Sequence, residues 1–270
     1  MDLSCIKQQG MSFVSVCLAV VSLSTVITSY AMSVSRGDVQ SLFPYISDTG
    51  GKPPESCVFG QLLNTTALLL FASAWIRYKQ MEDLDDDATG SRKFRICNLV
   101  SLIIATVAAL GLSIVANFQD VAVLTVHMIG ACCAFVGGVF YAGIQTWMSY
   151  KICPNWTSYS VCRFRLFLTM SGIVFVLTTY LSEIVASSKW KKHHVHNDTF
   201  QWNNEDGGYP AHLVSTFSEW FLAATILIFF ISYFSDFKKV VIELEMRPNS
   251  DPLGMPNMIN EDDDVEPLKL

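Results

Sequence analysis

Six stretches of this 270-residue chain are nearly free of charged residues and long enough to cross a lipid bilayer. A hydrocarbon core of about 30 Å needs roughly 20 apolar residues in helical form. Only helices and closed barrels satisfy their backbone hydrogen bonds in such a core. The six stretches are residues 11–32, 58–76, 96–116, 121–148, 166–186 and 211–234. The sequence therefore predicts an all-α polytopic integral membrane protein, with six transmembrane helices in one bundle and a single domain over residues 1–270.

The composition supports a membrane protein and argues against a nucleic-acid-binding one. Hydrophobic residues make up 51% of the chain, and the charged residues cluster between the apolar stretches. The net charge of −6 comes largely from two acidic runs, residues 82–87 and 261–266. The first apolar stretch exceeds the roughly 7–15 apolar residues of a signal peptide, so we expect it to be retained as a span.

The distribution of Lys and Arg predicts the orientation. An even number of spans places both termini on one side, and that side holds all but five of the 18 basic residues. The five on the opposite side are Arg36, Lys52, Lys189, Lys191 and Lys192. Because basic loops face the cytosol, we expect both termini to be cytosolic. Residues 245–270, rich in Pro, Asn and Asp, are predicted to form a disordered cytosolic tail.

This orientation singles out one glycosylation site. Asn-x-Ser/Thr sequons occur at Asn64, Asn155 and Asn197. Asn64 falls in a span and Asn155 on the cytosolic side. Only Asn197, between the fifth and sixth spans, would reach the lumenal glycosylation machinery.

Polar side chains inside the spans form the candidate site. They all fall in the half of the bundle that would face the lumen, and they are Asn64, His127, Glu183, His212 and Glu219. Ionisable groups are costly in lipid, so they normally face the bundle interior and find partners there. The loop 44–60, which carries Asp48, lies on the same side and is expected to fold down onto them. Together they predict a lumenal polar cluster that binds a lipid headgroup or senses protons; the alternative is a network that only ties the helices to the loop.

Small residues in the fourth span predict close helix packing. Gly130, Ala134, Gly138 and Ala142 recur every four residues and so share one face of the helix. Such a ridge lets a neighbouring helix approach closely. We expect internal packing in preference to a dimer face.

Motifs of enzymes and carriers are missing from the sequence. It has no HExxH or GxSxG motif, and His193, His194 and His196 follow lysines in what reads as a solvated loop. We therefore expect no catalytic residues, no bound metal and no cofactor. The expected partners are membrane lipids and proteins that contact the cytosolic loops and tail.

Several sequence blocks resemble one family of membrane proteins. The blocks PYISDTG (44–50) and PPESCVFG (53–60) are the most distinctive. Others, in order, are QQGMSF (8–13), RYKQ (77–80), GLSIVANFQ (111–119), SYKICPNW (149–156), WNNEDGGY (202–209), EW (219–220) and DFKKV (236–240). With these blocks the chain resembles the damage-regulated autophagy modulator (DRAM) family, within the wider FRAG/DRAM/SFK group of six-span proteins.

The resemblance carries expectations that the residues alone do not. It implies a lysosomal membrane regulator, not an enzyme, that promotes autophagy and stress-linked cell death. Two alternatives stay open. One is a lipid-handling protein with a lumenal pocket, which would bind, scramble or modify lipid. The other is a plasma-membrane organiser of phosphoinositide kinase. The plasma membrane and the Golgi or endoplasmic reticulum are the corresponding alternative locations.

Overall fold

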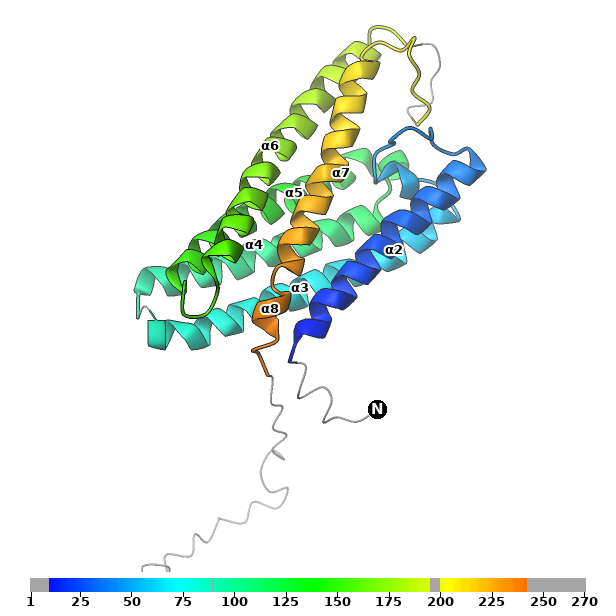
Figure 1. Ribbon diagram of the computed structural model, residues 1–270. Helices are drawn as coiled ribbons and strands as arrows, with labels where there is room; N and C mark the ends of the chain where they lie inside the picture. The colour runs from blue at the N-terminus through cyan, green and yellow to red at the C-terminus, as the bar shows by residue number, and fades with distance from the viewer. Residues whose placement is uncertain (1–9, 89, 195–199, 242–270) are drawn as a thin grey trace, which may run out of the picture.

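Helices and connecting loops account for the whole described part of the chain. The computed structural model describes residues 10–88, 90–194 and 200–241 (Figure 1). Its long helices are α2 (Ser12–Arg36), α3 (Glu55–Ala88), α4 (Arg92–Asn117), α5 (Asp120–Lys151), α6 (Tyr159–Trp190) and α7 (Tyr209–Ile231). A 3₁₀ turn, η1 (Asp48–Gly50), precedes α3, and the short α8 (Phe234–Phe237) follows α7. Residue Asn197 and the predicted tail 245–270 lie outside the described residues.

All six long helices are long and apolar enough to cross a membrane. Large apolar side chains such as Leu68, Phe140 and Phe167 are exposed on their outer faces. In water such an apolar surface would promote aggregation, whereas in a membrane it contacts the hydrocarbon of the bilayer. Since no strand occurs among the described residues, the predicted all-α class with six membrane-spanning helices is confirmed.

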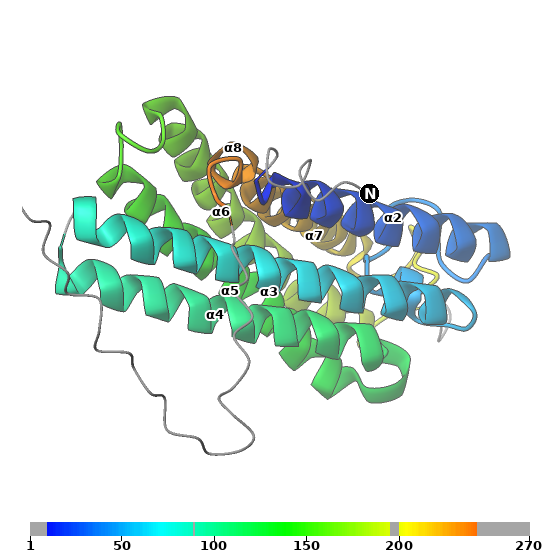
Figure 2. The same ribbon diagram turned by 90° about the horizontal axis from the view of Figure 1, so that it is seen from below.

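The helices form two parts that diverge toward one end of the molecule. Consecutive helices pack as neighbours, most extensively α4 with α5 and α6 with α7. In Figure 1 the α6–α7 pair is inclined to the group formed by α2 to α5, and Figure 2 shows the same bundle from below. The loop 37–54 and residues 191–194 and 200–208 lie where the two parts separate, and we call this the loop end.

The opposite end, which we call the terminal end, holds both ends of the described chain. The backbone N–H of Met11 donates a hydrogen bond to the carbonyl oxygen of Phe237 at 3.0 Å. Between the two ends lies an aromatic core in which Tyr141 of α5 stacks on Phe230 of α7, with ring centroids 5.0 Å apart. This core joins the two parts of the bundle where they are closest.

Small residues allow α5 to approach two neighbouring helices closely. A Cβ added to Gly130 would lie 2.9 Å from the carbonyl oxygen of Gly111 on α4. A Cβ added to Gly138 would lie 2.9 Å from the side chain of Ile226 on α7. Ala134 faces Gly111 as well, and Ala142 is buried in the aromatic core. The predicted ridge thus packs against helices of the same chain.

Two helices are much longer than the apolar stretches indicated. Helix α3 begins at Glu55 and continues to Ala88, beyond the predicted 58–76, and α6 begins at Tyr159 instead of residue 166. Residues 55–60, which we assigned to the loop, are therefore helical. Pro53 and Pro54 directly precede α3, where a missing backbone N–H costs no intrahelical hydrogen bond.

Candidate functional site

The loop 37–54 is folded into the bundle at the loop end. The backbone N–H of Ile46 donates to a carboxylate oxygen of Glu219 at 2.9 Å. The indole N–H of Trp220, the next residue on α7, donates to the carbonyl oxygen of Pro44 at 2.8 Å. On the other side, Ser33 of α2 donates to the carbonyl oxygen of Thr49 at 2.6 Å. The loop therefore closes the space between α2 and α7, as expected for the segment that carries Asp48.

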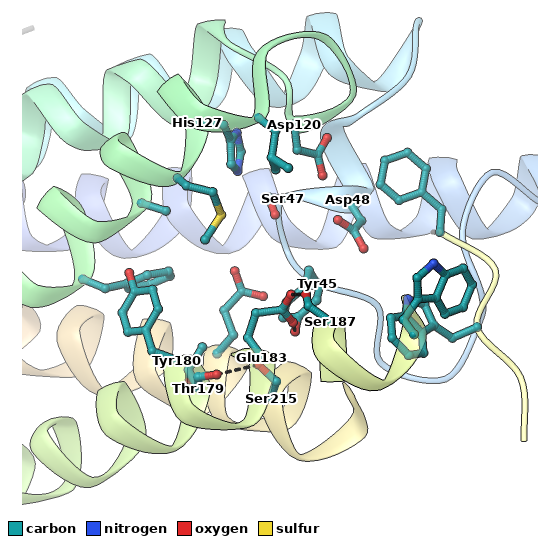
Figure 3. A pocket seen from close by; sticks show the side chains of 18 of the residues that line it. Tyr45, Ser47, Asp48, Asp120, His127, Thr179, Tyr180, Glu183, Ser187 and Ser215 are labelled. Atoms are coloured by element: carbon teal, nitrogen blue, oxygen red, sulfur yellow. Dashed lines mark hydrogen bonds between the residues drawn. The ribbon is translucent and has the colours of Figure 1, made fainter. Parts of the chain in front are cut away.

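A cavity of ≈ 360 Å³ lies beneath this loop. Its two main walls are α5 and α6, and α7 and the loop complete it. Figure 3 shows its lining residues converging from these elements. The divergence of the α6–α7 pair from α5 leaves this space, which the loop only partly fills.

Four carboxyl groups face the cavity, one from each surrounding element. They belong to Asp48 in η1, Asp120 at the start of α5, Glu183 on α6 and Glu219 on α7. Asp48 and Glu219 are only 8% and 7% exposed. Glu183 accepts hydrogen bonds from the hydroxyl groups of Tyr45 and Ser187. The result is a strongly acidic site of limited access.

Two side chains of the loop have raised pKa values. Burial raises the pKa of Asp48 well above its ordinary value, and the neighbouring carboxyl group of Asp120 raises the pKa further. Burial and the nearby Glu183 also raise the pKa of the Tyr45 hydroxyl. Tyr45 therefore stays a hydrogen-bond donor to Glu183, and Asp48 favours its neutral form.

The structure brings four of the six predicted site residues onto this cavity. Asp48, His127, Glu183 and Glu219 line it. The first three are labelled in Figure 3. The Nδ1 atom of His127 lies 2.8 Å from the carbonyl oxygen of Phe118, to which it donates. This contact fixes the imidazole ring against the turn between α4 and α5.

The other two predicted residues do not line the cavity, although the ring of His212 packs against Tyr45 and Trp202, which do. Asn64 bonds to Ser113 and Asn117, at 2.7 and 3.1 Å from its carbonyl oxygen, and so links α3 to α4. The ring of His212 stacks on Trp202 with centroids 4.2 Å apart. Although His212 and Glu219 are seven residues apart on α7, these contacts give them different roles.

Sequence reasoning missed several polar residues that line the cavity, among them Tyr45, Asp120 and Thr179. Tyr45 belongs to the distinctive PYISDTG block, and Asp120 follows a two-residue turn on the same side as that block. Both residues could therefore have been recognised from their positions in the sequence. Thr179 had no such signal, because a threonine within an apolar helix usually bonds to its own backbone.

A second cluster of charge is buried at the terminal end. One carboxylate oxygen of Asp236 accepts from Arg77 at 3.0 Å and from Arg165 at 2.8 Å. Both guanidinium groups also lie over the ring of Tyr233, at 4.9 and 4.8 Å from its centroid. The sequence placed both arginines on the side of the membrane that holds the two termini. They lie at that end of the molecule, but inside the bundle. Their further hydrogen bonds go to Gln80, Gln145, Ser149 and Ser232.

Comparison with known proteins places the chain among named relatives. It is 38% identical over 239 residues to DNA damage-regulated autophagy modulator protein 2 of Rattus norvegicus, covering 88% of each chain. It is 35% identical over 244 residues to DNA damage-regulated autophagy modulator protein 1 of Homo sapiens, covering 90% of this chain and 98% of that one. A third relative, the modulator of macroautophagy TMEM150B-B of Xenopus laevis, is 36% identical over 170 residues, 62% of this chain and 71% of the relative.

The family comparison covers the whole bundle described above. No solved structure matches the chain. The family model described as the Frag1/DRAM/Sfk1/Cwh43P N-terminal domain matches residues 10–240, which include every helix, the loop 37–54 and both buried clusters. The six-helix protein belongs to the Frag1/DRAM/Sfk1/Cwh43P family.

Proposed function

We propose that this protein is a lysosomal membrane protein that modulates autophagy and couples it to stress-induced cell death. The observation that carries the proposal is the similarity to relatives named as autophagy modulators over 88–90% of this chain. That similarity extends along all six helices, so it is a likeness of the whole fold and not of one motif. The protein would act through its membrane lipids and through protein partners at its terminal end, without catalysis or a cofactor.

The proposed orientation places the loop end in the lumen and the terminal end in the cytosol. The excess of Lys and Arg on the terminal side supports this assignment. The loop end is rich in carboxyl groups, and the raised pKa of Asp48 favours its neutral form. Because an acidic lumen protonates carboxyl groups, it suits this end of the protein better than a neutral compartment does.

Glycosylation provides a test of orientation. With the loop end in the lumen, the sequon at Asn197 receives a glycan and the sequon at Asn155 does not. Treatment with a glycosidase should shift the mobility of the wild-type protein and of the Asn155→Gln variant. It should leave the Asn197→Gln variant unchanged. A glycan on Asn155 would reverse the orientation.

The autophagy role is tested in cells that lack the endogenous gene. Re-expression of the tagged chain should place it with lysosomal markers and raise autophagic flux under stress. Flux is measured as turnover of a lipidated autophagosome marker with and without a lysosomal inhibitor. A matched variant that folds but is retained in the endoplasmic reticulum serves as the control. Lysosomal residence without any change in flux or in cell death would contradict the proposed role.

A further inference from the structure

We infer that the cavity beneath the loop binds the ammonium group of an amine-bearing ligand, and that the geometry favours the headgroup of a membrane lipid as its source. Such binding is a property distinct from modulation of autophagy.

The lining of the cavity has more acidic than basic side chains. Four carboxyl groups face the cavity, whereas Lys191 is the one Lys or Arg that lines it in the described part of the chain. Among the described residues, none of the four carboxyl groups forms an ion pair with a basic side chain. Asp48 favours its neutral form. A carboxylate among the other three that loses its water needs a partner of opposite charge, and a cation in the cavity would supply that partner.

One side chain of the lining has an unused hydrogen-bonding atom. Thr179 lines the cavity, is 6% exposed, and its hydroxyl oxygen has no hydrogen-bond partner. It lies in the same wall as Glu183 and beside Ser215 (Figure 3). An ammonium group carries three donors and no acceptor, so a set of carboxylate and hydroxyl oxygens matches it. A buried oxygen without a partner marks the place where the ligand would bond.

The lining fits an organic cation better than a metal ion. In the described part of the chain, no three His, Cys, Asp or Glu side chains stand close enough together to hold a metal ion. The cavity lining instead adds the aromatic ring of Tyr45 to the carboxyl groups, and the face of an aromatic ring attracts an organic ammonium group. The rings of Trp190 and Trp202 also line the cavity, but they lie 4.3 Å apart and Trp202 stacks on His212, so these faces are already covered.

An apolar wall of the cavity indicates that the amine comes from a lipid. Leu124, Met128, Ala131 and Phe135 line the cavity along one face of α5. Leu124 is 59% exposed, so this apolar wall continues onto the surface that faces lipid. A hydrocarbon chain has a path along α5, and the volume suits a headgroup but not a whole lipid. A lipid could therefore enter with its amine among the carboxyl groups and its chain against α5.

The test measures binding to the purified full-length protein in detergent micelles. The probes are lysophosphatidylethanolamine, which carries a lipid amine, and ethanolamine, which is soluble. Lysophosphatidylglycerol is the matched lipid without an amine. We expect saturable binding of the lipid amine and no competition by lysophosphatidylglycerol. Binding should weaken at least about tenfold in Asp120→Asn and in Glu183→Gln, each of which removes one carboxylate.

The control variant is Glu205→Gln, an exposed carboxyl group at the same end of the molecule, and it should bind as the wild type does. Binding of both amines would show that the ammonium group suffices, whereas binding of one alone would identify the lipid or the soluble amine as the source. Equal binding of lysophosphatidylglycerol by the wild-type protein overturns the inference, and this comparison needs no variant. Unchanged affinity in folded Asp120→Asn and Glu183→Gln overturns it too.

Discussion

At the scale of single residues, Glu219 shows how one buried carboxyl group joins a helix to the loop. It accepts the backbone N–H of Ile46 at 2.9 Å. The Glu219→Gln variant keeps an oxygen acceptor there, so its thermal midpoint should stay close to that of the wild type. The Glu219→Leu variant leaves the N–H of Ile46 without a partner, which should lower the free energy of unfolding by about 1–3 kcal/mol. Thermal unfolding in detergent at acidic pH measures both, and equal losses would show that charge, not the hydrogen bond, matters.

Individual residues of the candidate site could be predicted only where a charged side chain had to be buried. Asp48, Glu183 and Glu219 could be named because carboxyl groups beside or inside apolar stretches must find partners. His212 was assigned to the same cluster from its spacing to Glu219. Its ring is instead held by Trp202, which comes from a loop whose path the sequence does not specify. Periodicity thus identifies a helix face but not which loop covers it.

At the scale of helices, the contact between α4 and α5 depends on the absence of side chains. The Gly130→Ala variant places a Cβ 2.9 Å from the carbonyl oxygen of Gly111, so the helices must separate. We expect a loss of about 1–3 kcal/mol in the free energy of unfolding. On the same helix, a Cβ at Gly143 lies 3.8 Å from Thr169, an ordinary contact, so Gly143→Ala should be neutral or stabilising by up to about 1 kcal/mol. Equal effects of the two variants on thermal stability would contradict close packing at Gly130.

The buried charges at the terminal end connect α3, α6 and the segment after α7. The Asp236→Asn variant leaves Arg77 and Arg165 buried without a carboxylate, and we expect a loss of about 3–5 kcal/mol. The partly exposed pair of Arg36 and Asp38 provides the matched control, since Asp38→Asn should change the free energy of unfolding by about 0–1 kcal/mol.

A double-mutant cycle tests whether these charges compensate one another. Replacing Arg77 by Met in the Asp236→Asn background removes one of the two uncompensated charges. The double variant should therefore lose less stability than the sum of the two single variants. Strictly additive losses in chemical unfolding would show that the charges act independently.

The ends of the helices were harder to predict than their existence. Apolar stretches placed all six helices, but the second stretch was ended before Arg77 and the fifth was begun after Arg165. Arg77 lies within α3 and Arg165 within α6, and both helices continue through these residues because Asp236 and polar side chains neutralise them. The partner on another helix is a feature of tertiary structure. No property of the local sequence distinguishes such an arginine from one in water.

At the scale of the whole molecule, the sequence predicted that the polar groups lie at the same end of the bundle. It did not predict that the α6–α7 pair diverges from the other helices at that end. Short connections such as residues 118–119 between α4 and α5 require antiparallel neighbours. The inclination of the α6–α7 pair has no local signal, because it results from how all six helices and two loops pack. The cavity between α5 and α6 is a consequence of that inclination, and so are the roles of Tyr45 and Asp120.

The free energy of unfolding should depend on pH through Asp48, which lies in the loop and faces groups from the whole loop end. Its side chain faces titratable and charged groups of the loop and of all three surrounding helices: Tyr45, Asp120, His127, Glu183, Lys191 and Glu219. Burial raises the pKa of Asp48 in the folded protein, whereas the unfolded chain has a pKa of about 3.9. The folded state thus binds this proton more tightly. The binding of this proton therefore contributes to the free energy of unfolding. The contribution is complete at pH values below the pKa of the unfolded chain, and it is lost as the pH rises through the pKa of the folded protein.

The Asp48→Asn variant isolates this contribution, because the amide resembles the neutral acid and does not titrate. At pH about 4 its free energy of unfolding should be close to that of the wild type. As pH rises to about 8, the wild type should lose stability relative to the variant, by no more than about 1.4 kcal/mol per pH unit for one proton. Chemical unfolding at several pH values measures the difference. A difference that shrinks with rising pH would mean that Asp48 is charged in the folded protein. With the expected sign, acidity holds the loop onto the bundle, so the loop end would be most stable in the compartment proposed for this protein.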